Sequence, residues 1–420
     1  MEINIDSILA DRKEIEEITS DLFDYIDEIK NKLNKQQINF PEAFLFSIQE
    51  YFTSSNFNEY KSIFEKYKNL DSVVIIGIGG SNLILSSIYY FLKPHLKKEV
   101  FFVDDCDNLT IKESLVFIED KYLNNQKTGI ILISKSGKTL ETLISFQIIK
   151  NKIKELDKDW KSKILVVTEE NSLLAEISKI EGYDLINLSK EISGRFAIFS
   201  QANIFILKII DVDTDKLIKG ALEILQEGFL KDIDSNRILL ISSAIYSHFL
   251  KNNFIYNIFI SSPFIKYFGY WYRQLIAESL GKDKKGLVPL VSFFNKDLHS
   301  MYQLFASGPG YILTNFIFLK DSVFNQTINN IDFESIKTLE GKKLQEINTI
   351  IYASVRESYL KLNLPFYEIV LEKLNEEEIG KIIQFKMIEV IFLARLLKIN
   401  PFSQEAVEYY KSEIRKNLKI

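Results

Sequence analysis

The sequence predicts an α/β protein built from two parallel sheets whose faces are covered by helices. Short runs rich in Val and Ile, such as residues 73–76 and 129–133, recur along the chain and are separated by longer amphipathic stretches. Strands buried on both faces form continuous apolar runs, and strands that alternate with helices build parallel sheets. This alternation begins twice, and 420 residues exceed what one ordinary core accommodates, so we expect two domains.

The first half of the chain holds the elements of one sheet. Residues 1–65 are rich in Lys and Glu, and Leu22, Ile26 and Ile29 share a face at helical spacing, so this N-terminal segment is expected to be helical. A first domain follows over residues 66–200. Its expected strands are residues 73–76, 100–103, 129–133, 164–167 and 183–188.

The second half of the chain repeats the pattern. Its expected strands are residues 237–242, 256–260, 286–291, 311–318 and 364–370. These strands and the helical stretches between them are expected to form a second domain over residues 215–400, joined to the first near residues 200–214. A C-terminal segment, residues 401–420, is expected to hold a final helix over about residues 403–418.

The composition restricts the kinds of partner and cofactor. The chain has 52 Lys and Arg against 57 Asp and Glu, a net charge of −5, which gives no reason to expect nucleic acid as a partner. Cys106 is the single cysteine, and His95, His248 and His299 are too far apart for a metal-ligand spacing, so we expect no metal and no cofactor. The apolar runs fall well short of the about 20 residues of a membrane span, and the acidic N-terminus does not resemble a signal peptide. We therefore expect a cytoplasmic protein that binds no membrane.

The loop after the first expected strand has the composition of a phosphate-binding loop. Ligands of an open parallel sheet bind beyond the carboxyl ends of its strands, and glycines let the backbone approach them closely. Residues 77–81, G-I-G-G-S, lead into a helix whose N-terminus offers free N–H groups to an anion. Gly80 and Ser81 are therefore candidate phosphate ligands, although a tight turn without a ligand explains this loop equally well.

The loop after the third expected strand strengthens this interpretation. Residues 134–142, S-K-S-G-K-T-L-E-T, again open a helix. Ser134, Ser136 and Thr139 can donate hydrogen bonds to phosphate oxygens, and the helix N-terminus adds N–H donors. One of these hydroxyl groups could serve only as an N-cap. An N-cap needs one such residue, whereas this loop has three and two lysines, including Lys135, so the sequence favours a phosphorylated ligand.

Both loops resemble those of sugar-isomerase (SIS) domains, and a further motif is more specific. Residues 271–282, W-Y-R-Q-L-I-A-E-S-L-G-K, resemble the Q-x-x-x-E-S-x-G-K signature of the phosphoglucose isomerase family. The four-residue spacing places Gln274 and Glu278 on one helical face. The resemblance implies two SIS-type, flavodoxin-like domains, a sugar-phosphate substrate contacted by Gln274, and Glu278 as the base that moves a proton between C1 and C2. Considered alone, Glu278 would be an ordinary surface residue.

Two further segments match this family in chain order. Residues 193–197, S-G-R-F-A, resemble the family's G-G-R-[FY]-S, which implies that Arg195 stabilises an enediolate. His299 resembles the histidine that opens the sugar ring. In the family that histidine comes from the neighbouring subunit and pairs with a glutamate, which matches Glu141 here. The resemblance therefore implies a homodimer; without it, Arg195 would be a surface salt-bridge residue and His299 a structural one.

The last match lies near the C-terminus. Residues 400–411, N-P-F-S-Q-E-A-V-E-Y-Y-K, resemble N-P-F-[DN]-Q-x-G-V-E-x-x-K. The match implies that Gln404 contacts the substrate and that Lys411 takes part in ring opening. Considered alone, the segment is an amphipathic helix with a solvated lysine.

Together these matches imply reversible isomerisation of glucose 6-phosphate and fructose 6-phosphate through a cis-enediolate. One alternative is a bifunctional isomerase that also accepts mannose 6-phosphate. Such enzymes carry Thr where Gln274 stands, so the sequence favours the narrower specificity. Another alternative is a non-catalytic sugar-phosphate sensor built from SIS domains, which would need neither Glu278 nor Lys411.

Overall fold

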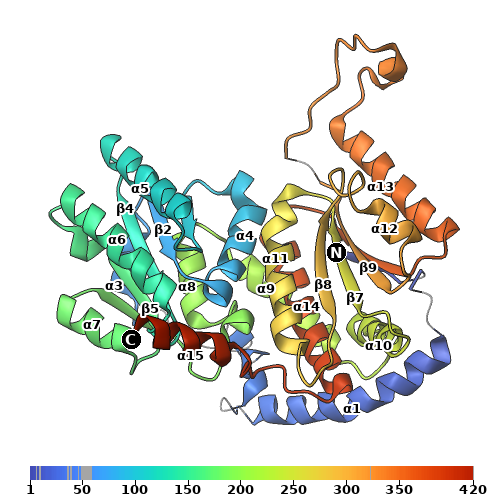
Figure 1. Cartoon of the computed structure of the whole chain (residues 1–420), viewed down its shortest axis with the longest axis horizontal. Helices are drawn as coiled ribbons and strands as arrows, with labels where there is room; N and C mark the ends of the chain where they lie inside the picture. Colours follow the sequence, from blue (N-terminus) through green and yellow to red (C-terminus); the bar gives the residue numbers. More distant parts are fainter. Residues whose placement is uncertain are drawn as a thin grey trace.

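Two five-stranded sheets, each flanked by helices, lie side by side in the molecule (Figure 1). The structure is a computed structural model that describes residues 1–5, 7–8, 11–35, 37, 40–45, 47–48, 59–321 and 323–419. Within these residues the neighbouring strands of both sheets are parallel, except for the antiparallel pair that β1 makes with β10. The predicted α/β architecture is confirmed.

The first sheet has the strand order β3-β2-β4-β5-β6. Its strands are β2 (Ser72–Ile76), β3 (Glu99–Val103), β4 (Thr128–Ile133), β5 (Ile164–Thr168) and β6 (Asp184–Asn187). Alternate side chains of a strand point to opposite faces, so Val74 and Ile76 pack in one core and Val73 and Ile75 in another. The first core is closed by α5 (Asn108–Leu123), α6 (Leu140–Leu156) and α7 (Leu173–Glu181), and the second by α4 (Leu83–Leu92) and α8 (Gln201–Ile209).

The second sheet has the order β1-β10-β9-β7-β8. Its strands are β1 (Glu2–Asn4), β7 (Ile255–Ile260), β8 (Val288–Phe293), β9 (Ile312–Leu319) and β10 (Phe366–Leu371). On one face Phe316 packs with α12 (Tyr302–Ser307) and α13 (Leu344–Lys361). On the other face Ile258 packs with α10 (Arg237–Leu250), α11 (Lys266–Leu280) and α14 (Glu376–Leu397).

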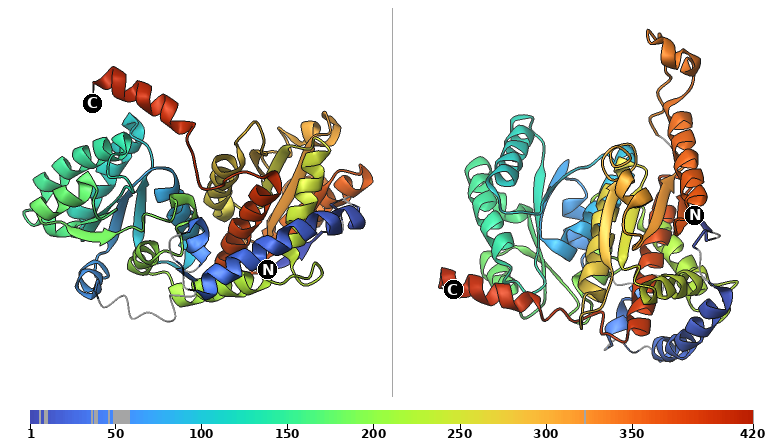
Figure 2. Two further views of the ribbon diagram at one scale, coloured as in Figure 1. Left: turned by 90° about the horizontal axis from the view of Figure 1, so that it is seen from below. Right: turned by 45° about the vertical axis from the view of Figure 1, so that its right-hand side comes forward.

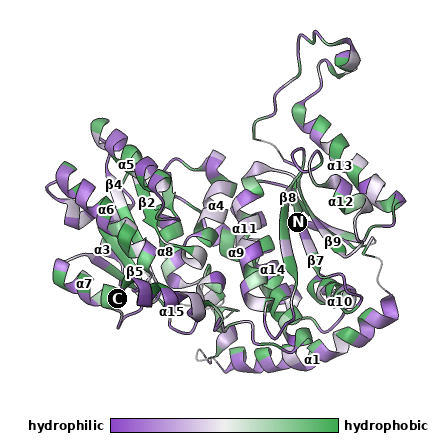
Figure 3. Ribbon diagram, viewed as in Figure 1, coloured by the Kyte–Doolittle hydropathy of each residue, from purple (hydrophilic) through white to green (hydrophobic). Residues whose placement is uncertain are grey.

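One apolar core joins the two sheets, because the cluster that holds Ile75 of β2 also holds Ile258 of β7. It includes side chains of α4, α8, α11 and α14, and of α1 (Arg12–Asn34) and α9 (Thr214–Gly228). The strands of both sheets are strongly apolar in Figure 3. The described residues also include helices α3 (Lys61–Tyr67) and α15 (Val407–Leu418), with short 3-10 turns between elements.

The C-terminal helix α15 differs from the other long helices, because none of its residues is buried. It crosses from the side of the second sheet, and the C-terminus lies on the side of the first sheet (Figure 2). No helix in the described part of the chain is long and apolar enough to cross a membrane.

The expected strand over residues 237–242 is wrong, because these residues begin helix α10. The Asn236 side chain accepts hydrogen bonds from the N–H groups of Ile238 and Leu239, both at 3.1 Å, and so caps the helix. The helix is buried on nearly every side, including Leu239 and Ile241. A helix buried all round shows no helical period in its apolar residues, and its first turns therefore have the pattern of a buried strand.

The N-terminal segment also differs from the helical expectation. Residues Glu2–Asn4 form β1, which pairs antiparallel with β10, and the Met1 amino group contacts Glu378 Oε1 at 2.6 Å. Helices α1 and α3 account for most of the described remainder of residues 1–65. The part of the expectation that falls on residues 49–58 lies outside the described residues.

Helices α9 and α14 cross at two glycines. A Cβ atom at Gly220 would lie 2.1 Å from the carbonyl oxygen of Glu377, and one at Gly380 would lie 2.1 Å from that of Leu217. Neither neighbour is a flexible side-chain end, so any larger residue must separate the two helices. Both helices contribute side chains to the core that joins the two sheets.

We predict that Gly220→Ala lowers the free energy of unfolding by at least about 2 kcal/mol, because overpacking outweighs the better helix propensity of alanine. Urea denaturation measures the change. The control is Lys219→Ala on the same helix, which removes an exposed ion pair with Glu377 and is expected to cost less than about 1 kcal/mol. Equal stability of the Gly220→Ala variant and the native chain would contradict the close crossing.

Candidate active site

The two predicted phosphate loops meet at one edge of the first sheet. The chain runs from β2 to β3 on one side and then to β4 on the other, so the strand order reverses between β2 and β4. Ligands of such sheets bind at this reversal, beyond the carboxyl ends of the strands. The loop 77–81 follows β2 and the loop 134–139 follows β4, so both lie at the reversal.

The loop after β2 touches the turn that carries Arg195. A Cβ atom at Gly80 would lie 2.7 Å from the backbone nitrogen of Arg195 and 2.8 Å from the carbonyl carbon of Gly194. Gly79 has φ +61°, and its Cβ would lie 3.1 Å from Gln274 Nε2. Only glycine fits this approach. Because these two residues lack side chains, the candidate phosphate loop lies against both the Arg195 turn and helix α11.

The loop after β4 presents two hydroxyl groups to one another. Ser134 Oγ and Thr139 Oγ1 lie 3.1 Å apart, and Ser136 Oγ accepts a hydrogen bond from the N–H of Lys138 at 3.2 Å. Thr139 occupies the N-cap position of α6, but its hydroxyl contacts Ser134 instead of a helix N–H group. Helix capping alone therefore does not account for the three hydroxyl residues.

Lys135 connects this loop to the segment before Arg195. Its Nζ donates hydrogen bonds to the carbonyl oxygens of Lys190 at 2.7 Å and Ile192 at 2.9 Å, and burial lowers its pKa. Lys135 also lines a small hollow, together with Gly80 and Ser81 of the first loop and residues of the segment 188–203. The ammonium group thus ties residues 190–192 to the loop after β4, and it also lies 3.7 Å from Glu169 Oε1.

Arg195 is the centre of the polar contacts, and it is 2 % exposed. Its Nη1 donates to Glu278 Oε1 at 2.8 Å and to Gln404 Oε1 at 2.7 Å. Its Nε donates to Ser279 Oγ at 2.9 Å, and its Nη2 to the carbonyl oxygen of Pro401 at 2.6 Å. Burial lowers the pKa of Arg195, and the charge of Glu278 opposes that shift. The guanidinium is therefore held in one position by two other segments of the chain.

Glu278 is fixed at both of its carboxylate oxygens. Oε1 accepts from Arg195, and Oε2 accepts from Gln274 Nε2 at 2.9 Å, as the four-residue spacing predicts. The Glu278 side chain is 23 % exposed, so it can be reached from outside. Among the described residues no donor reaches Gln274 Oε1, which is buried, and the amide nitrogen of the same side chain lies beside Gly79. This carboxylate and amide are arranged to meet a polar ligand.

The sequence did not assign a role to Lys282, although its motif contains that residue. Its Nζ donates to the carbonyl oxygens of Glu278 and Ser279, each at 2.8 Å, at the C-terminal end of α11. Burial, and then the nearby Arg195, lower the pKa of Lys282 to about 8. The last carbonyl groups of a helix lack intrahelical donors. A lysine just beyond the end of a predicted helix can supply such a donor, and the position of Lys282 in the sequence could have predicted this contact.

Three predicted site residues lie away from this cluster. Glu141 stands in the first turn of α6, and His299 is an exposed residue in the turn between β8 and α12. Helices α6 and α12 lie on opposite sides of the molecule (Figure 1). Lys411 lies on α15, where it contacts Glu408 Oε1 at 3.3 Å. One chain therefore gathers Glu278 and two glutamines around Arg195, but it does not bring His299 to Glu141.

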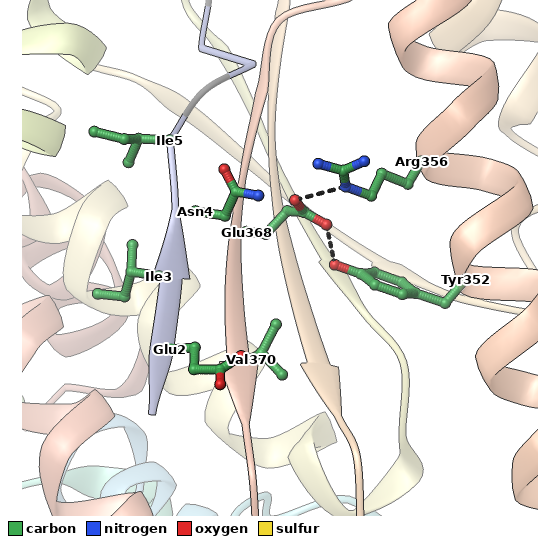
Figure 4. A pocket seen from close by; sticks show the side chains of 8 residues that line it. All are labelled: Glu2, Ile3, Asn4, Ile5, Tyr352, Arg356, Glu368 and Val370. Carbon is green, nitrogen blue, oxygen red and sulfur yellow. Dashed lines mark hydrogen bonds and ion pairs between the residues drawn. The ribbon is translucent and has the colours of Figure 1, made fainter.

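A second hollow is separate from this cluster and lies between β1, β10 and α13 (Figure 4). Its charged groups are paired, because Arg356 Nε contacts Glu368 Oε2 at 2.9 Å, the Tyr352 hydroxyl donates to Glu368 Oε1, and Glu2 contacts Lys320 at 3.1 Å. None of the residues expected to bind substrate lines it. We therefore assign it no part in the candidate site.

Comparison with known proteins identifies relatives over nearly the whole chain. The model of the phosphoglucose isomerase family matches residues 44–419. The glucose-6-phosphate isomerase of Methanocaldococcus jannaschii is 33% identical over 84% of this chain and 86% of its own. That of Mycoplasmopsis synoviae is 30% identical over 86% of each chain.

Solved structures share the fold. The crystal structure of a glucose-6-phosphate isomerase from Chlamydia trachomatis superposes with a TM-score of 0.80 at 18% identity, covering 98% of this chain and 86% of that one. The crystal structure of a hypothetical protein from Thermus thermophilus superposes with a TM-score of 0.84 at 23% identity, covering 99% of both chains.

We predict that Gly80→Ala weakens binding of a hexose 6-phosphate at least about tenfold, because its Cβ must displace the backbone of Arg195. Titration calorimetry measures the affinity. Gly194→Ala is a matched control on the opposite side of the same contact, since its Cβ would have no neighbour nearer than 3.6 Å. We expect that control to change the affinity less than about threefold. The same loss in both variants would contradict the role of the Gly80 approach.

Proposed function

Because this chain belongs to the phosphoglucose isomerase family, we propose that the side chains gathered around Arg195 carry its chemistry. The reaction is the reversible aldose–ketose isomerisation of glucose 6-phosphate and fructose 6-phosphate, a step of glycolysis. Membership in this family confirms the predicted glucose-6-phosphate isomerase activity, and it argues against the alternative of a non-catalytic sugar-phosphate sensor. The observation that carries the proposed residue roles is the position of Glu278, held at one oxygen by Arg195 and at the other by Gln274.

The proposed proton transfer uses the Glu278 carboxylate. For the aldose, Glu278 takes the proton from C2 while the C1 carbonyl oxygen becomes negative, which gives a cis-enediolate. The same carboxyl group then returns the proton to C1, the proton of the C2 hydroxyl passes to the oxygen on C1, and a carbonyl forms at C2. A general base must lie within hydrogen-bond reach of the proton that it removes. The bonds from Arg195 and Gln274 favour this role, because they fix the direction of both oxygen atoms.

We assign the stabilisation of the enediolate to Arg195. A donor that is already in place when negative charge develops needs no reorganisation during the reaction. Nε donates a hydrogen bond to Ser279 and Nη2 donates one to the carbonyl oxygen of Pro401, and these two bonds fix the position of the guanidinium. Nη1 donates both of its hydrogens, to Glu278 and to Gln404, so an enediolate oxygen must take the place of one of these two acceptors. Gln274 and Gln404 are proposed to contact substrate hydroxyl groups from either side.

We assign the phosphate group to the two loops at the β2–β4 reversal. The ligands proposed are Gly80, Ser81, Ser134, Ser136 and Thr139, with Lys135 providing positive charge at the hollow. Helix α6 begins directly after the second loop, and its N-terminus favours an anion. The contact between Gly80 and the Arg195 turn supports a short distance between the phosphate site and the base.

Ring opening is assigned to His299, oriented by Glu141, and to Lys411. A histidine can both donate and accept a proton near neutral pH. Because α6 and α12 lie on opposite sides of one chain, we propose a homodimer in which His299 reaches the site of a second copy. An arm over residues 324–343 projects from the body beside α13, and Phe333 on it is 71% exposed, which also favours a second copy (Figure 1). We place this dimer in the cytoplasm, where its charged substrates are retained.

We predict that Glu278→Gln lowers kcat by at least about a thousandfold while substrate affinity changes little, because the amide cannot accept the proton. A coupled assay that starts from fructose 6-phosphate measures the turnover. The control, Glu405→Gln, changes an exposed acidic residue beside Gln404 and is expected to keep kcat within about twofold. Near-normal turnover of the Glu278→Gln variant would contradict the assignment of Glu278 as the general base.

We predict that mixing two inactive variants, His299→Ala and Glu278→Gln, restores about one quarter of the native activity. Random reassociation makes half of the dimers mixed, and each mixed dimer has one site with both groups intact. Activity is measured after the subunits are unfolded together and refolded. If His299 acted within its own chain, no mixed dimer would hold an intact site, and the mixture would stay inactive.

A further inference from the structure

Helix α11, which carries Gln274 and Glu278, also takes part in a polar cluster that is closed off from solvent. We call it the buried tyrosine cluster, and it comprises Tyr256 on β7, Tyr272 on α11, Tyr367 on β10, and Lys386 and Glu389 on α14. Each of these five residues has 0% exposure. The cluster is not part of the site described above, and none of the proposed catalytic steps uses it.

The bonds of this cluster converge on the Glu389 carboxylate. Oε2 contacts Lys386 Nζ at 2.8 Å and accepts from the Tyr367 hydroxyl at 3.2 Å. Oε1 accepts from the hydroxyl of Tyr272. The Tyr256 hydroxyl lies 2.9 Å from that of Tyr272, and Lys386 Nζ donates to the Tyr367 hydroxyl at 2.7 Å. Two strands and two helices are thus joined by directional bonds at one point.

Stability alone does not explain this arrangement. Removing two charges from water is costly, and apolar residues of similar volume in place of a buried ion pair are often neutral or stabilising. Burial lowers the pKa of Lys386 to about 8, which reflects that cost, while the Glu389 charge opposes the shift. Directional bonds, unlike apolar contacts, define one relative position of the elements that they join.

Tyr272 is the member of the cluster that connects it to the active site. It lies two residues before Gln274 and six before Glu278 on the same helix, so any rotation or sliding of α11 moves all three. Trp271, its neighbour, donates from Nε1 to the carbonyl oxygen of Arg195 at 3.1 Å. Helix α11 is thus bonded to the Glu389 carboxylate at Tyr272 and to the Arg195 turn at Trp271.

We propose that Tyr272 is a positioning residue, whose bond to Glu389 fixes the rotation of α11 and so holds the Glu278 carboxylate against Arg195. This inference rests on the proposed role of Glu278 as the base. A misplacement of about 1 Å in a catalytic group can cost about a hundredfold in rate. The larger effect is expected in kcat, because the phosphate loops belong to the other sheet, whereas Gln274, which also lies on α11, contributes a smaller change in KM.

The test compares Tyr272→Phe with Tyr367→Phe. Each variant removes one buried hydroxyl donor to Glu389, but β10, which carries Tyr367, holds none of the proposed site residues. We expect both variants to melt at lower temperatures than the native protein. Tyr272→Phe is expected to lower kcat at least about tenfold with KM within about twofold, whereas Tyr367→Phe keeps kcat within about twofold. Equal loss of kcat in both variants, or no loss in Tyr272→Phe, overturns the proposal.

A second variant separates positioning from stability. In Lys386→Met combined with Glu389→Leu, apolar side chains replace the buried pair while the Tyr272 and Tyr367 hydroxyls keep their contacts with Tyr256. We expect a melting temperature no lower than that of Tyr272→Phe, while kcat falls at least about tenfold. Native kcat in this stable double variant overturns the proposal. Glu278→Gln is assayed beside it: if that variant stays active, the base assignment fails. If Glu278→Gln is inactive and Tyr272→Phe behaves like Tyr367→Phe, only the positioning role fails.

Discussion

The buried guanidinium of Arg195 is the interaction on which the rest of the site depends. A charge removed from water is tolerated only when its donors are matched by acceptors, and here each nitrogen of the guanidinium has one. Those acceptors come from α11 on the second-sheet side and from the segment before α15, while Arg195 itself follows the first sheet. The hydrogen bonds of this one guanidinium therefore hold together three segments that are far apart in the sequence.

The glycines of the first loop extend this arrangement to the proposed phosphate site. With a side chain at residue 80, the loop after β2 could not lie against the backbone of Arg195. The strand reversal between β2 and β4 sets the second loop beside the first. The proposed phosphate site is thereby linked to the Arg195 turn through backbone contacts, and from there to the carboxylate of Glu278 through the Arg195 guanidinium.

The sequence predicted the parts of this molecule that depend on local pattern. Alternating apolar runs predicted both sheets, and the spacing of Gln274 and Glu278 predicted that their side chains meet. Residues 237–242 were misassigned because a helix and a strand that are buried all round have the same apolar run. Strand β1 lies at the start of the sequence and its partner β10 lies near the other end, so no residues close to β1 in sequence indicate the pairing. The partners of Lys282 and of the Lys386–Glu389 pair are likewise set by tertiary contacts, which single-sequence patterns do not contain.

The central claim is that one bound substrate reaches both the phosphate loops and the Arg195–Glu278 pair. A crystal structure with fructose 6-phosphate tests it most directly. The account predicts the phosphate between the loops 79–81 and 134–139, and C1 and C2 within about 3.5 Å of the Glu278 carboxylate. A phosphate bound elsewhere, or a sugar whose C1 and C2 point away from Glu278, would contradict the account.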